Sequence, residues 1–126
     1  MSIKHILVVD DEEEIRNLFL DILAPRGYEV VGARSGPEAI AYAGDHAFDV
    51  VFLDIKMPGM NGVETFEALK RLSPEAQYVM ITGYAGSHLV DQSLAEGALF
   101  CLPKPFGVAD ILDLIRSLEQ GAPVTG

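Results

Sequence analysis

The residues of this chain that could carry out chemistry stand just after short apolar runs. They are two adjacent aspartates, a single aspartate, a threonine and a lysine: Asp10, Asp11, Asp54, Thr82 and Lys104. Carboxylates that crowd together repel one another, and such a group either raises a pKa or binds a cation. An all-oxygen, partly hydrated set of ligands suits Mg²⁺. Neither histidine nor cysteine, the usual zinc ligands, stands at these positions, which argues against zinc.

A cation, a lysine ammonium and a hydroxyl donor can together neutralise the oxygens of a phosphoryl group. A carboxylate can itself be the nucleophile and form an aspartyl-phosphate. Asp54 is the best candidate because it ends an apolar run alone. Taken singly, Asp54 could start a loop, Thr82 could cap a helix and Lys104 could be a solvated loop residue, but their joint placement favours a site.

The acidic run continues past the aspartates as Glu12, Glu13 and Glu14. We expect these three only to favour the positive N-terminus of the helix that begins there.

The elements that must position these residues alternate between strand and helix patterns, which predicts an α/β domain with a parallel sheet. Continuous apolar runs predict four strands that are buried on both faces, and a weaker run with a glutamate predicts an edge strand; they are 6–9, 50–53, 78–81, 98–102 and, at the edge, 28–33. Apolar residues at helical spacing predict helices near 15–23, 38–45, 63–72, 87–96 and 108–118. Asn61, with Glu64 three residues on, predicts a helix N-cap. Ligands bind beyond the carboxyl ends of the strands in open parallel sheets, so we expect the five chemical residues to meet at one rim.

Composition limits the possible functions. With 126 residues the chain is expected to form one domain. Its net charge is −10 and it has no cluster of lysine and arginine, so direct nucleic-acid binding is not expected. No apolar run approaches the roughly 20 residues of a membrane span, and the N-terminus lacks the pattern of a signal peptide, so we expect a cytoplasmic protein.

These motifs together resemble the receiver domain of bacterial two-component response regulators. The resemblance rests on Asp10-Asp11 after a first strand, Asp54 in the segment LDIKMPGMNG, Thr82-Gly, and Lys104-Pro-Phe. It covers about residues 4–119. It implies a flavodoxin-like (βα)5 sandwich with sheet order 2-1-3-4-5, an order the chemotaxis receivers illustrate. It also implies a receiver domain at 1–120, followed by a tail or linker stub at 121–126.

The resemblance implies a role for each acid. Asp54 would accept a phosphoryl group from the phosphohistidine of a kinase or from a small acyl phosphate. Asp11, Asp54 and the main-chain carbonyl of Lys56 would bind Mg²⁺ directly, and Asp10 would bind it through water. Lys104 would pair with the phosphate.

The resemblance also implies a switch. Thr82 would move to bond the phosphoryl group and shift a two-state equilibrium at the surface near strands 4–5 and helices 4–5. The Lys104–Pro105 bond would be cis. Receivers usually carry Tyr or Phe three residues before this lysine, whereas this chain has Cys101. Phe100 should not substitute because successive strand side chains point to opposite faces, so we expect Thr82 to switch with little help from residue 101.

Two residues of the rim have open assignments. Lys56 and Tyr84 stand two positions after Asp54 and Thr82. By resemblance they would tune dephosphorylation through water access; otherwise they are solvated rim residues.

The implied partners are a sensor histidine kinase or a histidine phosphotransfer domain, and an output domain C-terminal to the receiver in a longer protein. The chain would be a monomer or a phosphorylation-dependent dimer with no membrane contact, and a signalling domain rather than an enzyme acting on external substrates. Two alternatives remain. A haloacid-dehalogenase-like phosphatase would need a second acid where Lys56 stands, and a flavodoxin-like flavin carrier would need a phosphate-binding loop where this chain is acidic.

Overall fold

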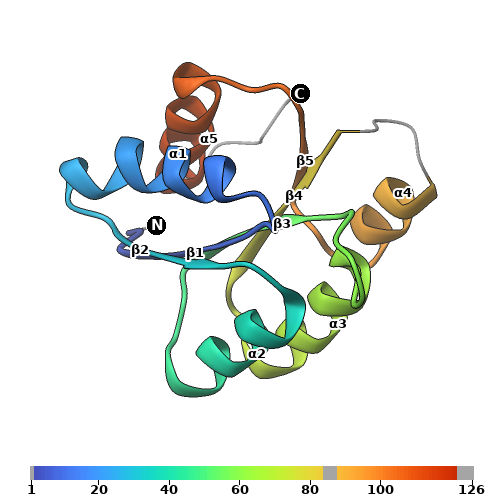
Figure 1. Ribbon diagram of the computed structural model, residues 1–126. Coiled ribbons are helices and arrows are strands. Elements are labelled where there is room, and N and C mark those ends of the chain that lie inside the picture. Colours follow the sequence, from blue (N-terminus) through green and yellow to red (C-terminus); the bar gives the residue numbers. More distant parts are fainter. Residues whose placement is uncertain (1, 84–87, 122–126) are drawn as a thin grey trace.

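The chain folds into five parallel strands that alternate with five α-helices within residues 2–83 and 88–121, the part that the computed structural model describes (Figure 1). The sheet order is β2-β1-β3-β4-β5, as the resemblance implied. The elements are β1 His5–Val9, α1 Glu13–Leu23, a 3-10 turn η1 Ala24–Arg26, β2 Glu29–Ala33, α2 Gly36–Asp45, β3 Val50–Asp54, α3 Gly62–Leu72, β4 Gln77–Thr82, α4 His88–Ala95, β5 Phe100–Pro103 and α5 Val108–Gln120.

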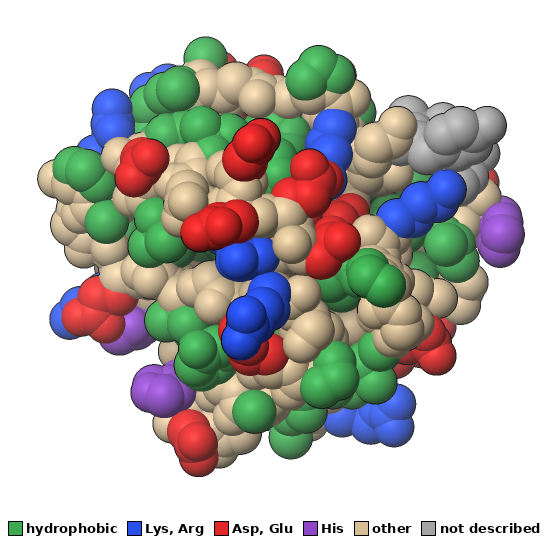
Figure 2. Space-filling view, viewed as in Figure 1, with side chains coloured by type: hydrophobic (Ala, Val, Ile, Leu, Met, Phe, Trp, Pro, Cys, Tyr) green, Lys and Arg blue, Asp and Glu red, His purple; other side chains and the backbone are tan. Residues whose placement is uncertain are grey.

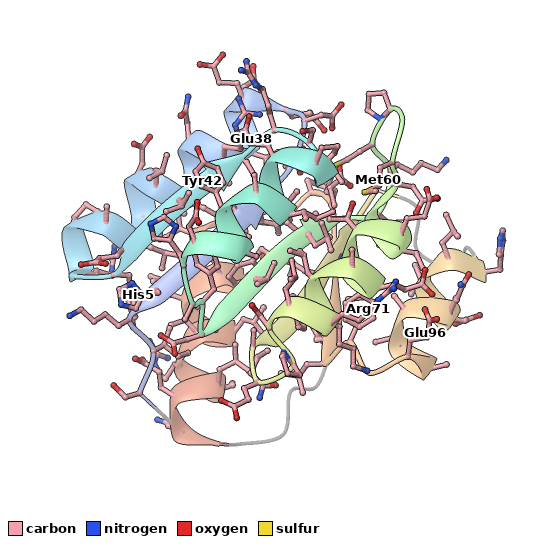
Figure 3. The ribbon with its side chains drawn as sticks, turned by 90° about the horizontal axis from the view of Figure 1, so that it is seen from below. His5, Glu38, Tyr42, Met60, Arg71 and Glu96 are labelled. Atoms are coloured by element: carbon pink, nitrogen blue, oxygen red, sulfur yellow. The ribbon has the colours of Figure 1, made fainter. Side chains whose placement is uncertain are left out.

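Helices cover both faces of the sheet. Helices α1 and α5 lie on one face, and α2, α3 and α4 lie on the other (Figure 1). Figure 3 shows α2, with Glu38 and Tyr42, beside α3, which carries Arg71 near its end. Successive strand residues enter different cores: Leu7 packs with the α2–α4 layer and Val8 with the α1–α5 layer. The inner strands are therefore apolar on both faces, which explains their continuous apolar runs.

The last strand departs from its prediction. The run 98–102 was expected to be buried on both faces, but β5 begins at Phe100 and lies at the sheet edge that the implied order gives it. Phe100 and Cys101 are only half-buried, and Pro103 is exposed. Ala98 is buried although it precedes the strand. The apolar run therefore includes a core residue of the preceding loop as well as residues of β5. The weak run at 28–33 forms the other edge strand, as predicted.

The helix ends follow local signals. Asn61 caps α3, because its Oδ1 accepts from the Glu64 N–H at 2.9 Å and its own N–H donates to Glu64 Oε1 at 3.0 Å. This confirms the predicted N-cap. Helix α5 ends at Gln120, and its C-cap Gly121 has a φ of +69°, the left-handed conformation that glycine adopts readily. The predicted tail at 121–126 lies outside the described residues beyond this glycine.

None of the helices within 2–83 and 88–121 combines the length and apolar character needed to cross a membrane.

Strand register brings the chemical residues to one edge of the sheet. Val9 pairs with Leu53, so Asp10 and Asp54 leave adjacent strands at the same level. Asp54 in turn pairs with Ile81, and Thr82 pairs with Pro103. Parallel strands share their direction, so all these carboxyl ends open on the same rim.

Candidate functional site

Asp10 is the most enclosed acid of the rim, with none of its surface exposed. Its main-chain N–H donates to Ala33 O at 3.0 Å, and its Oδ1 accepts from the Glu12 N–H at 2.9 Å. Arg16, one turn into α1, donates from Nη1 to the main-chain oxygen of Asp10 at 2.8 Å. The backbone around Asp10 is therefore held by three separate hydrogen bonds, and Oδ2 is left without a hydrogen-bond partner.

Asp54 ends β3 and is 3% exposed. Its Oδ1 accepts a long hydrogen bond, 3.3 Å, from the Lys56 N–H. The main chain of the next residue, Ile55, is fixed by two hydrogen bonds. Its N–H donates to Ile81 O at 2.9 Å, and its carbonyl oxygen accepts from the Gly62 N–H at 2.8 Å. The nucleophile candidate thus stands on the rigid end of an inner strand.

Lys104 faces these acids from the segment after β5. Its Nζ lies 2.9 Å from Glu12 Oε1, 3.4 Å from Asp10 Oδ2 and 3.7 Å from Asp54 Oδ2. Its main-chain N–H donates to Thr82 O at 2.7 Å, which ties the lysine to the end of β4. The Lys104–Pro105 peptide is cis, as the resemblance implied.

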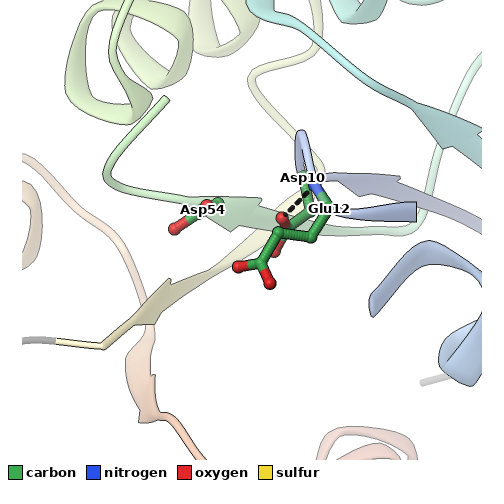
Figure 4. A group of neighbouring side chains, drawn as sticks. All are labelled: Asp10, Glu12 and Asp54. Atoms are coloured by element: carbon green, nitrogen blue, oxygen red, sulfur yellow. Dashed lines mark hydrogen bonds between the residues drawn. The ribbon is translucent and has the colours of Figure 1, made fainter. Parts of the chain in front are cut away.

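Three carboxylates approach within 4.8 Å of one another, those of Asp10, Glu12 and Asp54 (Figure 4). On the face shown in Figure 2, acidic side chains gather over the region where β1 and β3 end and α1 begins. The prediction that Glu12 only favours the helix N-terminus is wrong, because its side chain bonds Lys104. Asp11, expected to bind metal directly, is exposed and lies outside the group of three. The metal-binding roles predicted for Asp10, Asp11, Asp54 and the carbonyl of Lys56 stay predictions.

Burial and mutual repulsion perturb the two buried acids. Burial, followed by the charge of Asp10, raises the pKa of Asp54 to about 7, although Lys104 opposes the shift. Burial also raises the pKa of Asp10, against the hydrogen bond from Glu12 and the charge of Lys104. Burial by itself would lower the pKa of Lys104, but its hydrogen bond to Glu12 and the charges of Asp54 and Asp10 raise it above its ordinary value. One ammonium therefore offsets the repulsion only in part.

This donor set fits a hard divalent cation. Asp10 Oδ2 is buried and makes no hydrogen bond. Beside it lies the carboxylate of Asp54, which is also buried, and burial makes the ionised form of Asp54 less favourable. Carboxylate and carbonyl oxygens are the ligands that Mg²⁺ takes, and no histidine or cysteine belongs to the group of three. The acidic triad is of the type that the resemblance implies for a Mg²⁺ site.

Cys101 and its neighbour Phe100 lie on different faces of the sheet. Thr82 is 3% exposed at the end of β4. Cys101 packs against the core beneath α2–α4, whereas Phe100 packs against the α1–α5 core. The expected failure of Phe100 to substitute thus has a geometric basis. Burial raises the pKa of Cys101 to about 11, so its thiol stays protonated at neutral pH. Tyr84, the other expected tuning residue, lies outside the described residues.

Three residues that support the site escaped the sequence reasoning. Glu12 reaches a lysine 92 residues away, Arg16 holds the backbone of Asp10, and Gly62 packs against the peptide after Asp54. An added Cβ at Gly62 would lie 2.5 Å from Ile55 Cα, so only glycine fits there. For this residue the sequence did hold a signal, because Gly62 is the last residue of the segment LDIKMPGMNG on which the resemblance rests. The contacts of Glu12 and Arg16 depend on the folded register and left no pattern in the sequence.

Comparisons with known proteins agree with this geometry. The model of the response regulator receiver domain matches residues 6–116. A response regulator receiver protein of Anaeromyxobacter sp. is 38% identical over 108 residues, which are 86% of this chain and 45% of that protein. Sporulation initiation phosphotransferase F of Bacillus subtilis is 31% identical over 116 residues, which are 92% of this chain and 94% of that protein. The chain thus spans less than half of the first relative and nearly all of the second.

Two solved structures with a similar fold are also a receiver domain and a response regulator. A CheY-like receiver domain protein of Methanospirillum hungatei superposes with a TM-score of 0.89 at 35% identity, covering 95% of this chain and 96% of that one. A response regulator of Burkholderia pseudomallei, solved with a phosphorylated aspartic acid, a calcium ion and citrate, superposes with a TM-score of 0.80 at 30% identity, covering 98% and 77%. The phosphatase and flavin-carrier alternatives lose their support. This chain belongs to the receiver domains of two-component response regulators, which are phosphoacceptor signalling modules.

Proposed function

We propose that this receiver accepts a phosphoryl group on Asp54, from the phosphohistidine of a sensor histidine kinase or phosphotransfer domain or from a small acyl phosphate. The observation that carries the proposal is the placement of a buried strand-end carboxylate, Asp54, 3.7 Å from the ammonium of Lys104. The carboxylate oxygen would bond to phosphorus as the P–N bond to the donor imidazole breaks. The imidazole would leave with the electron pair of that bond and take up a proton.

The surrounding residues have separate roles in this step. Asp54 must be ionised to attack, and Lys104 lowers its pKa against the effect of burial. Asp10, Asp11, Asp54 and the main-chain carbonyl of Lys56 are the groups that would hold Mg²⁺. The ion would supply positive charge to the phosphoryl oxygens. Lys104 would add a second positive charge from the side of β5.

Phosphorylation would then be read at the surface near β4, β5, α4 and α5. The buried hydroxyl of Thr82 stands at the end of β4, directly before the segment that leads to α4. A new bond from this hydroxyl to the phosphoryl group would shift a two-state equilibrium toward an active form of this surface. The output would be a separate partner or a domain C-terminal to this one, and the response could include dimerisation. The chain covers only 25% of one relative, DctD of Rhizobium meliloti, which therefore has much additional sequence. A kinase-coupled role would place the chain in the cytoplasm.

Incubation with acetyl phosphate and Mg²⁺ tests the phosphoacceptor assignment. We expect intact-mass analysis to show one added phosphoryl group on the wild type and none on Asp54→Asn. Asp21→Asn, an exposed acid on α1, is the matched control and should be labelled like the wild type. An Asp54→Asn protein that is labelled at the wild-type rate, or steady release of phosphate without a labelled species, would contradict the proposal.

A further inference from the structure

The closest partner of Lys104 is the exposed acid of the site. Lys104 Nζ donates to Glu12 Oε1 at 2.9 Å, whereas Asp10 Oδ2 and Asp54 Oδ2 lie at 3.4 and 3.7 Å. Hydrogen bonds of this type fall mostly between 2.7 and 3.2 Å, so neither buried acid makes a close one with the ammonium. The side chain of Glu12 is 57% exposed and that of Lys104 is 19% exposed. The ammonium thus lies closer to the solvent-exposed carboxylate of Glu12 than to the buried carboxylates of Asp10 and Asp54.

The placement of Glu12 is built into the backbone. Glu12 is the residue before the first turn of α1, and its N–H donates to Asp10 Oδ1 at 2.9 Å, the bond dashed in Figure 4. This bond holds the Cα of Glu12 beside the buried acids, from where its side chain reaches Lys104. Glu13 carries the same charge one residue later but is not among the carboxylates that pair with Lys104.

A phosphoryl group on Asp54 would need the same ammonium. Anionic oxygens make their strongest hydrogen bonds with Lys at about 2.7–2.9 Å. Asp54 Oδ2 is 3.7 Å from Nζ while Glu12 holds the lysine. The phosphoryl oxygens would extend beyond Asp54 Oδ2, into the space where Lys104 Nζ donates to Glu12 Oε1. A lysine has three donors but a single positive charge, so Glu12 and the phosphoryl oxygens would compete for the same ammonium.

We propose that Glu12 is a positioning residue that competes with the phosphoryl group on Asp54 for the ammonium of Lys104, and so weakens the phosphorylated state of this receiver. The inference rests on the proposed function, because it takes Asp54 as the phosphoacceptor. A role for Glu12 as a ligand of the cation would predict a different result. If Glu12 bound the cation together with Asp10 and Asp54, loss of its charge would weaken Mg²⁺ binding.

Beryllofluoride, which binds a carboxylate as a phosphoryl mimic, tests the competition directly. The wild type, Glu12→Gln and Glu13→Gln are titrated with it at saturating Mg²⁺, with the midpoint read by calorimetry. We expect Glu12→Gln to bind roughly two- to fivefold more tightly than Glu13→Gln, the factor that a partly exposed ion pair supplies. Glu13→Gln makes the same change in net charge, so it removes the general electrostatic effect from the comparison.

Glu12→Asp separates the contact from the charge. The shorter side chain keeps the negative charge but lacks the reach to Lys104, so this variant should also bind beryllofluoride more tightly than the wild type. A separate Mg²⁺ titration without beryllofluoride should give Glu12→Gln the affinity of Glu13→Gln. Equal or weaker beryllofluoride binding by Glu12→Gln, or a loss of Mg²⁺ affinity confined to it, overturns the inference. Failure of the wild type to bind beryllofluoride, or binding that persists in Asp54→Asn, would instead overturn the proposed function.

Discussion

At the scale of single residues, Asp54 illustrates a conflict between stability and chemistry. A carboxylate that is 3% exposed beside a second buried acid destabilises the folded chain when it ionises. The same burial holds Asp54 in a rigid position at the end of an inner strand, where a nucleophile has little freedom to move. Lys104 offsets this conflict only in part, because its shortest contact is with Glu12.

This conflict predicts a pH-dependent gain in stability for Asp54→Asn. The pKa of Asp54 rises from 3.8 to about 7 on folding, so the native state binds the proton more tightly than the unfolded state. The free energy of unfolding contributed by this group therefore falls as the pH rises from about 4 to about 7. Without divalent cations, we expect Asp54→Asn to exceed the wild type by about 1–3 kcal/mol at pH 8 and to approach it at pH 4.

Urea denaturation in the presence of a chelator at the two pH values measures this difference. Asp21→Asn provides the control for loss of an exposed acid. A wild type that is more stable than Asp54→Asn at pH 8 would contradict the expectation.

Gly62 gives a second prediction at this scale. A Cβ at this position would lie 2.5 Å from Ile55 Cα and would overlap the carbonyl group of Asp54. Gly62→Ala must therefore displace the end of β3 or the start of α3, and we expect it to lower the free energy of unfolding by about 1–3 kcal/mol and to slow labelling by acetyl phosphate. Gly44→Ala in α2, where a Cβ would have open space, should be neutral or stabilising. Equal stability of the two variants would show that the close packing at Gly62 is unimportant.

At the scale of elements, the start of α3 and the loop that bears the site are one local unit. The chain between β3 and α3 runs from Asp54 to the capping residue Asn61, and Gly62 then donates back to Ile55. The capping box thus fixes both the first turn of the helix and the return of the loop to the sheet. The phosphoacceptor candidate Asp54 and the helix cap Asn61 are therefore the two ends of a segment of only eight residues.

Removal of this cap should weaken the element measurably. Asn61→Ala loses the acceptor of the Glu64 N–H, and we expect the free energy of unfolding to fall by about 1 kcal/mol. Glu64→Gln is the matched control, because glutamine can still accept from the Asn61 N–H and complete the box. Thermal denaturation of both variants provides the measurement; a loss as large for Glu64→Gln as for Asn61→Ala would count against capping as the cause.

At the scale of the whole molecule, the acidic rim is an electrostatic strain on the fold. Half of the net charge of −10 comes from the five consecutive acids that begin at Asp10, and register places Asp54 beside them. The strain comes from topology, since β1 and β3 are neighbours in the sheet although they are far apart in the sequence. A cation that binds only the folded arrangement would relieve it.

Mg²⁺ should therefore raise the melting temperature. A ligand at ten times its dissociation constant stabilises the folded state by about 1.4 kcal/mol. Differential scanning calorimetry with added MgCl2, against NaCl of equal ionic strength, separates site binding from screening. The rise should disappear after chelation and in Asp54→Ala. A rise that NaCl reproduces fully would contradict a specific site.

The sequence by itself determined the elements and the rim. Apolar runs predicted the inner strands, Asn61 and Glu64 predicted the start of α3, and the residues after each run predicted the group of Asp10, Asp54 and Lys104. These signals are local, because a continuous apolar run and a capping box are each contained within one short segment of the sequence. Only the tertiary structure decided that β5 begins at Phe100, inside the apolar run, and that the side chain of Glu12 bonds Lys104 rather than only favouring the helix N-terminus. Both facts follow from which strands become neighbours, and long-range register of that kind is not written in any single segment.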